Sequence, residues 1–238
     1  MKPELIVALD VQSSDMAKQL VDSLPPEVTW YKVGLELFTA EGPAALQYLR
    51  KKNKKIFLDL KFHDIPNTVA AAVTSAARHG VAMLTLHAGG GREMLRAAAQ
   101  SAAKAGSAAP KLVAVTTLTS LAQNDLTELG IARALAEHTL ALGEMAISAG
   151  IDGLVCSPHE ARAFRDKLGK APILVTPGIR PAGVDVADQK RVATPEIAIQ
   201  AGASFLVVGR PITQASDSAS AAQAILREIE RAIVVSSN

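Results

Sequence analysis

The sequence is poor in the residues that mark several common protein classes. Cys156 is the only cysteine among 238 residues, so an intrachain disulfide and a cysteine-cluster metal site are both excluded. Aromatic residues make up 3% of the chain and its net charge is +2, whereas nucleic-acid binders usually carry a basic stripe or stacking aromatic side chains. No stretch approaches the roughly 20 apolar residues of a membrane span, and Asp10 interrupts the first apolar run. We therefore expect a cytoplasmic protein that binds neither nucleic acid nor membrane.

Short apolar segments rich in β-branched residues recur along the whole chain. They are hydrophobic on both faces, which is typical of parallel strands covered by helices. These segments are residues 5–11, 29–35, 55–61, 82–88, 111–118, 152–158, 172–178 and 204–210. Alanine-rich amphipathic segments lie between them, and those at 69–80, 92–106 and 133–150 each end in glycine, the residue favoured at helix C-termini.

The repeating unit is a strand followed by a helix. Eight such units of about 30 residues each match the size of a βαβ repeat. Neither a linker nor a shift in composition divides the chain. A single (β/α)₈ TIM barrel over residues 1–238 fits this count better than a doubly wound sheet does, and it places any active site at the C-terminal ends of the strands.

Unusual polar residues gather at those strand ends. Asp59 and Lys61 alternate along the third segment, so they share one face about 7 Å apart along the strand. Lys32 on the adjacent segment can then reach Asp59. Such a group is either part of an active site or a structural ion-pair network. Asp64 precedes Pro66 and has two interpretations, a helix-capping carboxylate or a functional group.

The last two strand ends indicate a phosphate site. Gly178 and Gly209 allow close approach of the backbone, and Arg180 and Arg210 supply bidentate donors. The polar loop at residues 181–194 is either a lid over the bound phosphate or an ordinary surface loop. No two of the five histidines have the spacing that would place both on one helix face as zinc ligands, so we expect no zinc site. We therefore interpret His63 and His87 as hydrogen-bonded or partly exposed side chains.

These residues carry a resemblance to a known family. The block DLKFHDIPNT (59–68) has the D-x-K-x-x-D form of the orotidine 5′-phosphate decarboxylase family. The segments ALD (8–10), YKVG (31–34), LTS (118–120), PGIRP (177–181) and VVGRPI (207–212) match the same family in the same order. The match covers nearly the whole chain and resembles the monofunctional bacterial type.

The resemblance implies decarboxylation of orotidine 5′-monophosphate to UMP in pyrimidine biosynthesis, without cofactor or metal. It makes Lys61 the proton donor to C6, places Asp59 by the substrate carboxylate, and gives Lys32 and Asp10 contacts to the ribose. It also implies a homodimer with shared active sites. The remaining implied contacts are Asp64 and Thr68 reaching into the neighbour's site, Thr119 at the pyrimidine, and Arg180, Gln189, Gly209 and Arg210 at the phosphate.

Other functions stay open at this point. Sugar-phosphate decarboxylases or aldolases of the same superfamily carry a metal-binding Glu where this chain has Lys32, and an ammonium cannot bind magnesium. A Schiff-base aldolase needs a neutral lysine, while neighbouring carboxylates favour the charged form. A non-catalytic phosphate binder would need the Gly and Arg loops but not the charged residues of the third segment.

Overall fold

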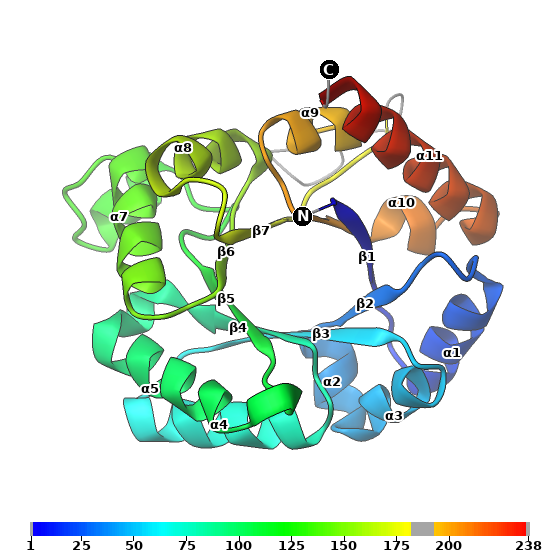
Figure 1. The fold of residues 1–238 in the computed structure, drawn as a ribbon, viewed down its shortest axis with the longest axis horizontal. Coiled ribbons are helices and arrows are strands. Elements are labelled where there is room, and N and C mark those ends of the chain that lie inside the picture. The colour runs from blue at the N-terminus through cyan, green and yellow to red at the C-terminus, as the bar shows by residue number, and fades with distance from the viewer. Residues whose placement is uncertain (1, 182–192, 237–238) are drawn as a thin grey trace.

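The chain forms a closed barrel of parallel strands surrounded by helices (Figure 1). The computed structural model describes residues 2–181 and 193–236. Within them the strands pair in chain order, and β8 pairs with β1 to close the barrel. The strands are β1 (Glu4–Ala8), β2 (Trp30–Val33), β3 (Lys55–Phe62), β4 (Met83–His87), β5 (Lys111–Val115), β6 (Gly153–Val155), β7 (Ile173–Thr176) and β8 (Phe205–Val208). The predicted (β/α)₈ TIM barrel is confirmed.

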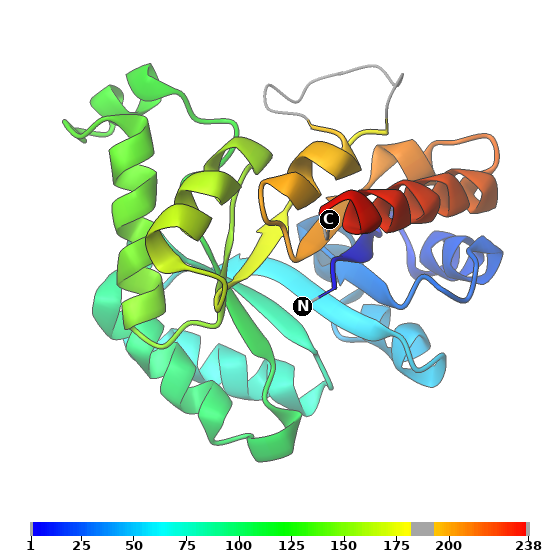
Figure 2. The same ribbon diagram turned by 45° about the horizontal axis from the view of Figure 1, so that its top comes forward.

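Helices follow the strands and form the outer layer, in which α11 lies beside α9 (Figure 2). The α-helices of the described residues are α1 (Ser14–Ser23), α2 (Leu35–Glu41), α3 (Ala44–Lys51), α4 (Pro66–Arg78), α5 (Gly91–Ala103), α6 (Gln123–Glu128), α7 (Leu135–Ser148), α8 (Pro158–Leu168), α9 (Pro195–Gln200), α10 (Arg210–Thr213) and α11 (Ser218–Ser236). Two 3₁₀ turns are η1 (Ala88–Gly90) and η2 (Gly106–Ala108). Gly80 and Gly150 adopt the positive φ predicted for residues just beyond a helix. Gly106 also has a positive φ, but it lies three residues beyond the end of α5 and begins η2.

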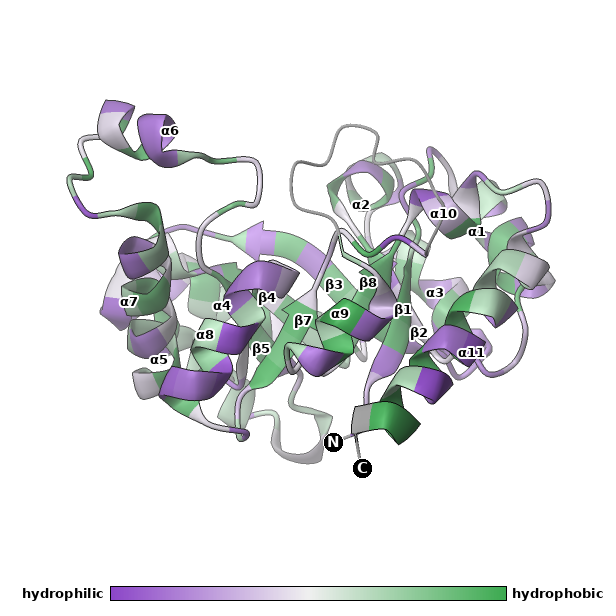
Figure 3. Cartoon of the chain, turned by 90° about the horizontal axis from the view of Figure 1, so that it is seen from above, coloured by the Kyte–Doolittle hydropathy of each residue, from purple (hydrophilic) through white to green (hydrophobic). Residues whose placement is uncertain are grey.

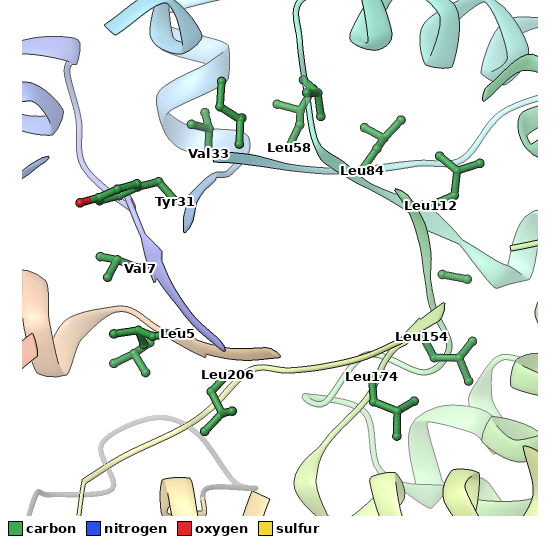
Figure 4. Packing of buried hydrophobic residues seen from close by; sticks show 14 of the residues in the cluster. Leu5, Val7, Tyr31, Val33, Leu58, Leu84, Leu112, Leu154, Leu174 and Leu206 are labelled. Atoms are coloured by element: carbon green, nitrogen blue, oxygen red, sulfur yellow. The ribbon is translucent and has the colours of Figure 1, made fainter. Parts of the chain in front are cut away.

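Two hydrophobic cores follow from the alternation of side chains along each strand. The outward-facing residues pack under the helices, and Figure 4 shows side chains such as Val7, Leu84 and Leu206 pointing away from the barrel axis. The inward-facing residues form a second cluster inside the barrel, which includes Trp30 and Phe205 in edge-to-face contact. Burial on both faces explains why the strand segments are continuously apolar.

The interior changes character along the barrel axis. Its apolar cluster contains Ala8, Trp30, Phe57 and Met83, and the next inward position after each of these four residues is polar. Figure 3 shows the chain from the side, with the N-terminal end of the barrel below and α6 and α10 toward the opposite end. The apolar residues therefore fill the interior beneath a polar mouth at the C-terminal ends of the strands.

Candidate active site at the barrel mouth

Four charged side chains of alternating sign form a row across the barrel mouth. Lys32 Nζ lies 2.8 Å from Asp10 Oδ1 and 3.6 Å from Asp59 Oδ2. Lys61 Nζ lies 2.9 Å from Asp59 Oδ1. The predicted contacts of Lys32 and Lys61 with Asp59 are present, and Asp10 extends the row by one more carboxylate.

Strand register explains why Lys32 lies between two carboxylates. Ala8 on β1 pairs with Lys32 on β2, and Lys32 pairs with Phe57 on β3. Asp10 and Asp59 each follow two residues later, so both carboxylates stand one inward position above Lys32. The lysine side chain extends upward between them, because that direction leads out of the apolar interior toward opposite charge.

Burial differs along the row. The side chains of Lys32 and Asp59 are only 11% and 14% exposed, whereas those of Lys61 and Asp10 are 32% and 55% exposed. Buried charges need paired neighbours of opposite sign, and the alternation supplies them. The more exposed ammonium of Lys61 is the cation that a ligand at the mouth can approach.

Lys61 occupies an irregular part of β3. The pairing of β3 with β4 shifts between Leu58 and Phe62, and Lys61 has φ 50°, a left-handed conformation that non-glycine residues seldom adopt. Regular strand alternation therefore does not extend to Lys61, although the sequence interpretation assumed it. The two side chains still meet, since Lys61 Nζ lies 2.9 Å from Asp59 Oδ1 in this irregular conformation.

Gly34 lies at the inward position directly beyond Lys32. A Cβ added at Gly34 would stand 2.9 Å from Lys32 Nζ and 3.2 Å from Asp10 Oδ1. Real Cβ atoms do not approach other atoms so closely, so any side chain here would displace the ammonium. The glycine thus leaves the space in which Lys32 meets Asp10.

His63 and His87 stack on each other beside the row, with ring centroids 5.1 Å apart. Burial and the nearby His63 and Lys61 lower the pKa of His87 below its ordinary value of 6.5. Its Nδ1 accepts a hydrogen bond from the Gly89 N–H, so Nε2 carries the proton of the neutral ring. His87 is thus half-buried and hydrogen-bonded, and His63 is exposed. No group of three His, Cys, Asp or Glu side chains in residues 2–181 and 193–236 is placed to hold a metal ion.

Asp64 and Thr68 lie apart from the row, and both are exposed. Asp64 is not the N-cap residue of α4, because Ile65 holds that position and makes no side-chain capping hydrogen bond. The Asp64 carboxylate accepts a hydrogen bond from the Ile65 N–H at 2.6 Å instead. The helix-cap alternative is therefore wrong. Ile65, between the two residues, is 67% exposed, so this edge of the mouth presents an apolar and an acidic side chain outward.

The other predicted residues follow the ends of β5, β7 and β8. Thr119 is half-buried in the loop after β5. Gly209 reaches the row, since a Cβ there would meet Asp10 Oδ2 at 3.7 Å, and Arg210 begins α10. Arg180 is buried and donates to the Ile179 carbonyl at 3.0 Å. Gln189 and most of the loop at 181–194 lie outside the described residues, but Ala193 bridges to Ile179 and Thr194 caps α9.

Sequence reasoning missed Thr85, which hydrogen-bonds to both Asp59 and the Lys61 backbone. It also missed the space that Gly34 leaves. The alternation from Met83 to Thr85 to His87 places all three on the inner face of β4, and this signal could have found the threonine. Nothing local in the sequence indicates the irregularity of β3.

A barrel of this topology with acids and bases gathered at the carboxyl ends of its strands defines a TIM-barrel enzyme. The model of the orotidine 5′-phosphate decarboxylase / HUMPS family matches residues 3–225. The chain belongs to this family.

Individual relatives agree over nearly the full length. The chain is 50% identical to orotidine 5′-phosphate decarboxylase of Moorella thermoacetica over 96% of its own length and 93% of that protein. It is also 50% identical to the enzyme of Idiomarina loihiensis, with 95% and 98% of the two chains covered. The crystal structure of orotidine 5′-phosphate decarboxylase from Lactobacillus acidophilus superposes with a TM-score of 0.85 at 39% identity and covers 95% of this chain and 98% of that one.

Proposed function

We propose that this protein decarboxylates orotidine 5′-monophosphate to UMP and CO₂, the last step in making UMP. The observation that carries the proposal is the row Asp10–Lys32–Asp59–Lys61 at the barrel mouth. Relatives named for this activity cover almost the whole chain. One cysteine, buried and free, fits a cytoplasmic location.

The chemistry explains why a fixed ammonium is needed. Breaking the bond between C6 and the carboxylate leaves an electron pair on an aromatic ring carbon, with no carbonyl to delocalise it. The Lys61 ammonium stabilises that pair electrostatically as it forms. CO₂ is released as this bond breaks. The Lys61 ammonium gives a proton to C6, and the resulting amine regains its proton from water. Asp59 holds the ammonium at 2.9 Å, and its repulsion of the substrate carboxylate is relieved as CO₂ departs.

The remaining substrate contacts follow the resemblance position by position. Asp10 and Lys32 bind the ribose, and Thr119 binds the pyrimidine. The phosphate is held by a set of residues after β7 and β8, which are Arg180, Gln189, Gly209 and Arg210. Phosphate binding far from C6 can supply energy that orients the ring over Lys61, and the loop at 181–194 acts as its lid.

Two copies of the chain form a homodimer with shared active sites. Asp64 and Thr68 are exposed at the edge of the mouth, and so is Ile65 beside them, at 67%, so all three are free to contact a second copy of the chain. In the dimer, Asp64 and Thr68 enter the neighbour's site. Asp64 then adds a second carboxylate to the surroundings of the neighbour's Lys61.

A metal-dependent sugar-phosphate reaction is the second candidate, because the D-x-K-x-x-D form of residues 59–64 resembles that of the wider superfamily as well. Lys32 disfavours it. Its ammonium lies 2.8 Å from Asp10 and 3.6 Å from Asp59, so it occupies the place between two carboxylates where a divalent cation would be held, and it cannot act as a ligand.

A spectrophotometric assay of orotidine 5′-monophosphate loss tests the proposal. We expect turnover by the purified protein without added cofactor, unchanged by EDTA. Lys61→Ala should lower kcat at least about 1,000-fold, since it removes both the electrostatic stabilisation and the proton donor. UMP binding should remain measurable in that variant.

Lys170→Ala is the matched control, because this lysine is exposed and remote from the mouth. It should keep wild-type turnover. Activity that disappears with EDTA would support the metal-dependent candidate, and retained turnover by Lys61→Ala would contradict the mechanism.

A further inference from the structure

Thr85 lies inside the barrel next to the charged row. It faces inward from β4, and the pairing of Leu58 with Leu84 places it level with Asp59 on β3. The side chain is fully buried. A buried hydroxyl needs hydrogen-bond partners, and here both partners belong to the row.

The hydroxyl connects the backbone of one row residue to the side chain of another. Thr85 Oγ1 accepts from the Lys61 backbone N–H at 2.8 Å and donates to Asp59 Oδ1 at 3.0 Å. The direction of both bonds is unambiguous, because an amide N–H only donates and a carboxylate only accepts. Asp59 Oδ1 also accepts from Lys61 Nζ at 2.9 Å. The three residues thus form a closed hydrogen-bonded ring.

This ring coincides with the irregular part of β3. The register between β3 and β4 shifts between Leu58 and Phe62, and within that interval the Lys61 N–H reaches the Thr85 side chain. Lys61 holds its left-handed φ of 50° there. Such a conformation persists only where the surroundings over-determine it, and the Thr85 hydroxyl is one of the groups that do so.

We propose that Thr85 is a positioning residue, whose hydroxyl holds the Lys61 backbone and the Asp59 carboxylate in the geometry that aims the Lys61 ammonium. This inference rests on the proposed decarboxylation. Without the hydroxyl, Asp59 loses one of its donors and can rotate, while Lys61 loses the bond that supports its strained backbone. The ammonium then samples positions away from C6.

Thr85→Val tests the proposal, because valine keeps the shape and removes only the hydroxyl. We expect kcat to fall about 10- to 100-fold, as for a reacting group misplaced by about 1 Å, with KM and UMP affinity within about threefold of wild type. Thr85→Ser restores the hydroxyl and should recover most of kcat. If Thr85→Val does not fold, Thr85→Ala, which leaves room for water beside the amide, replaces it with the same expectation.

Thr139→Val is the matched control. Thr139 is also buried, and its hydroxyl donates one hydrogen bond, to Thr117 at 2.8 Å, but it lies on α7 in the outer layer. This variant should lose stability and keep wild-type kcat. The comparison separates the effect of losing any buried hydroxyl hydrogen bond from the effect of losing the one that contacts Asp59 and Lys61.

A second readout needs no substrate. Hydrogen exchange of the Lys61 amide, followed by NMR, should accelerate in Thr85→Val relative to neighbouring strand amides. Absence of turnover in the wild type would overturn the proposed function, but the hydrogen-exchange measurement would still show whether Thr85 holds the Lys61 backbone. Wild-type kcat in folded Thr85→Val, or an equal loss in Thr85→Ser, would overturn the positioning role.

Discussion

Single residues at the mouth are specified by the space around them as much as by their charge. Lys32 reaches Asp10 only because the next inward position, just beyond the end of β2, is Gly34, whose backbone is extended at φ −98°. An alanine is therefore permitted by the backbone and excluded only by the Lys32 ammonium, 2.9 Å from its Cβ. The atom that must move is the end of a flexible side chain, so the effect falls on the site rather than on folding.

Gly34→Ala should lower kcat/KM for decarboxylation about 10- to 100-fold, because it displaces the Lys32 ammonium from its two carboxylates. Gly34→Ser should do the same while supplying a side-chain cap to α2, so its free energy of unfolding should match or exceed that of Gly34→Ala. Steady-state kinetics and urea unfolding measure the two effects.

The control for Gly34 is its coupling to Lys32. In a Lys32→Ala background, Gly34→Ala should cause no further loss of kcat/KM, since the displaced group is gone. A full additional loss in the double variant would show that Gly34 acts through something other than Lys32.

At the scale of elements, Arg165 on α8 ties together the chain around the N-terminal ends of β7 and β8. Its Nε and Nη2 donate to the Gly202 carbonyl, and Nη1 donates to the carbonyls of Gly169 and Pro172. Nη2 also reaches the Ser204 hydroxyl. The guanidinium thus supplies hydrogen bonds to backbone carbonyls in the turns that precede β7 and β8, where these carbonyls lie outside the pairing of the strands.

Arg165→Met should lower the free energy of unfolding by about 2–4 kcal/mol, because the aliphatic stem is kept and the charged donors are lost. Urea unfolding measures this change. Arg162→Met on the same helix is the control. Arg162 pairs with Asp166 on the exposed surface, so its replacement should leave stability unchanged within error. Equal effects of the two substitutions would contradict the role given to Arg165.

At the scale of the whole molecule, the proposed dimer makes each site depend on two chains. In that proposed arrangement, Lys61 belongs to the site's own chain and Asp64 comes from its neighbour. No helix in residues 2–181 and 193–236 has the length and apolar character needed to cross a bilayer.

Mixing two inactive variants tests this arrangement. Lys61→Ala and Asp64→Asn should each be strongly impaired, but a heterodimer of the two carries one intact site and one doubly altered site. After unfolding and refolding together in equal amounts, about one quarter of all sites should be wild type. Activity that does not rise above that of the separate variants would contradict shared sites.

Much of the fold follows from local periodicity. Strand segments apolar on both faces, each followed by an amphipathic helix, indicate a parallel sheet covered by helices, and eight of them close a barrel. Most strands are shorter than the apolar segments, as at β5, where the segment 111–118 contains the strand Lys111–Val115, whereas β3 extends to Phe62, one residue beyond its segment. Residues 116–118 belong to the loop that leads toward Thr119. Thr116 and Thr117 stay buried beyond the end of the strand, which makes them resemble strand residues in the sequence, whereas Leu118 is exposed.

The sequence by itself determined the barrel, the end of the barrel that carries the polar residues, and the family. Alternation along a strand and composition are local properties, and motif order is read directly from the chain. The tertiary structure alone decided that Asp10 pairs with Lys32, that Asp64 does not cap α4, and that Lys61 adopts a left-handed backbone held by Thr85. These features depend on the register between neighbouring strands and on the space between their side chains, which only closure of the barrel defines.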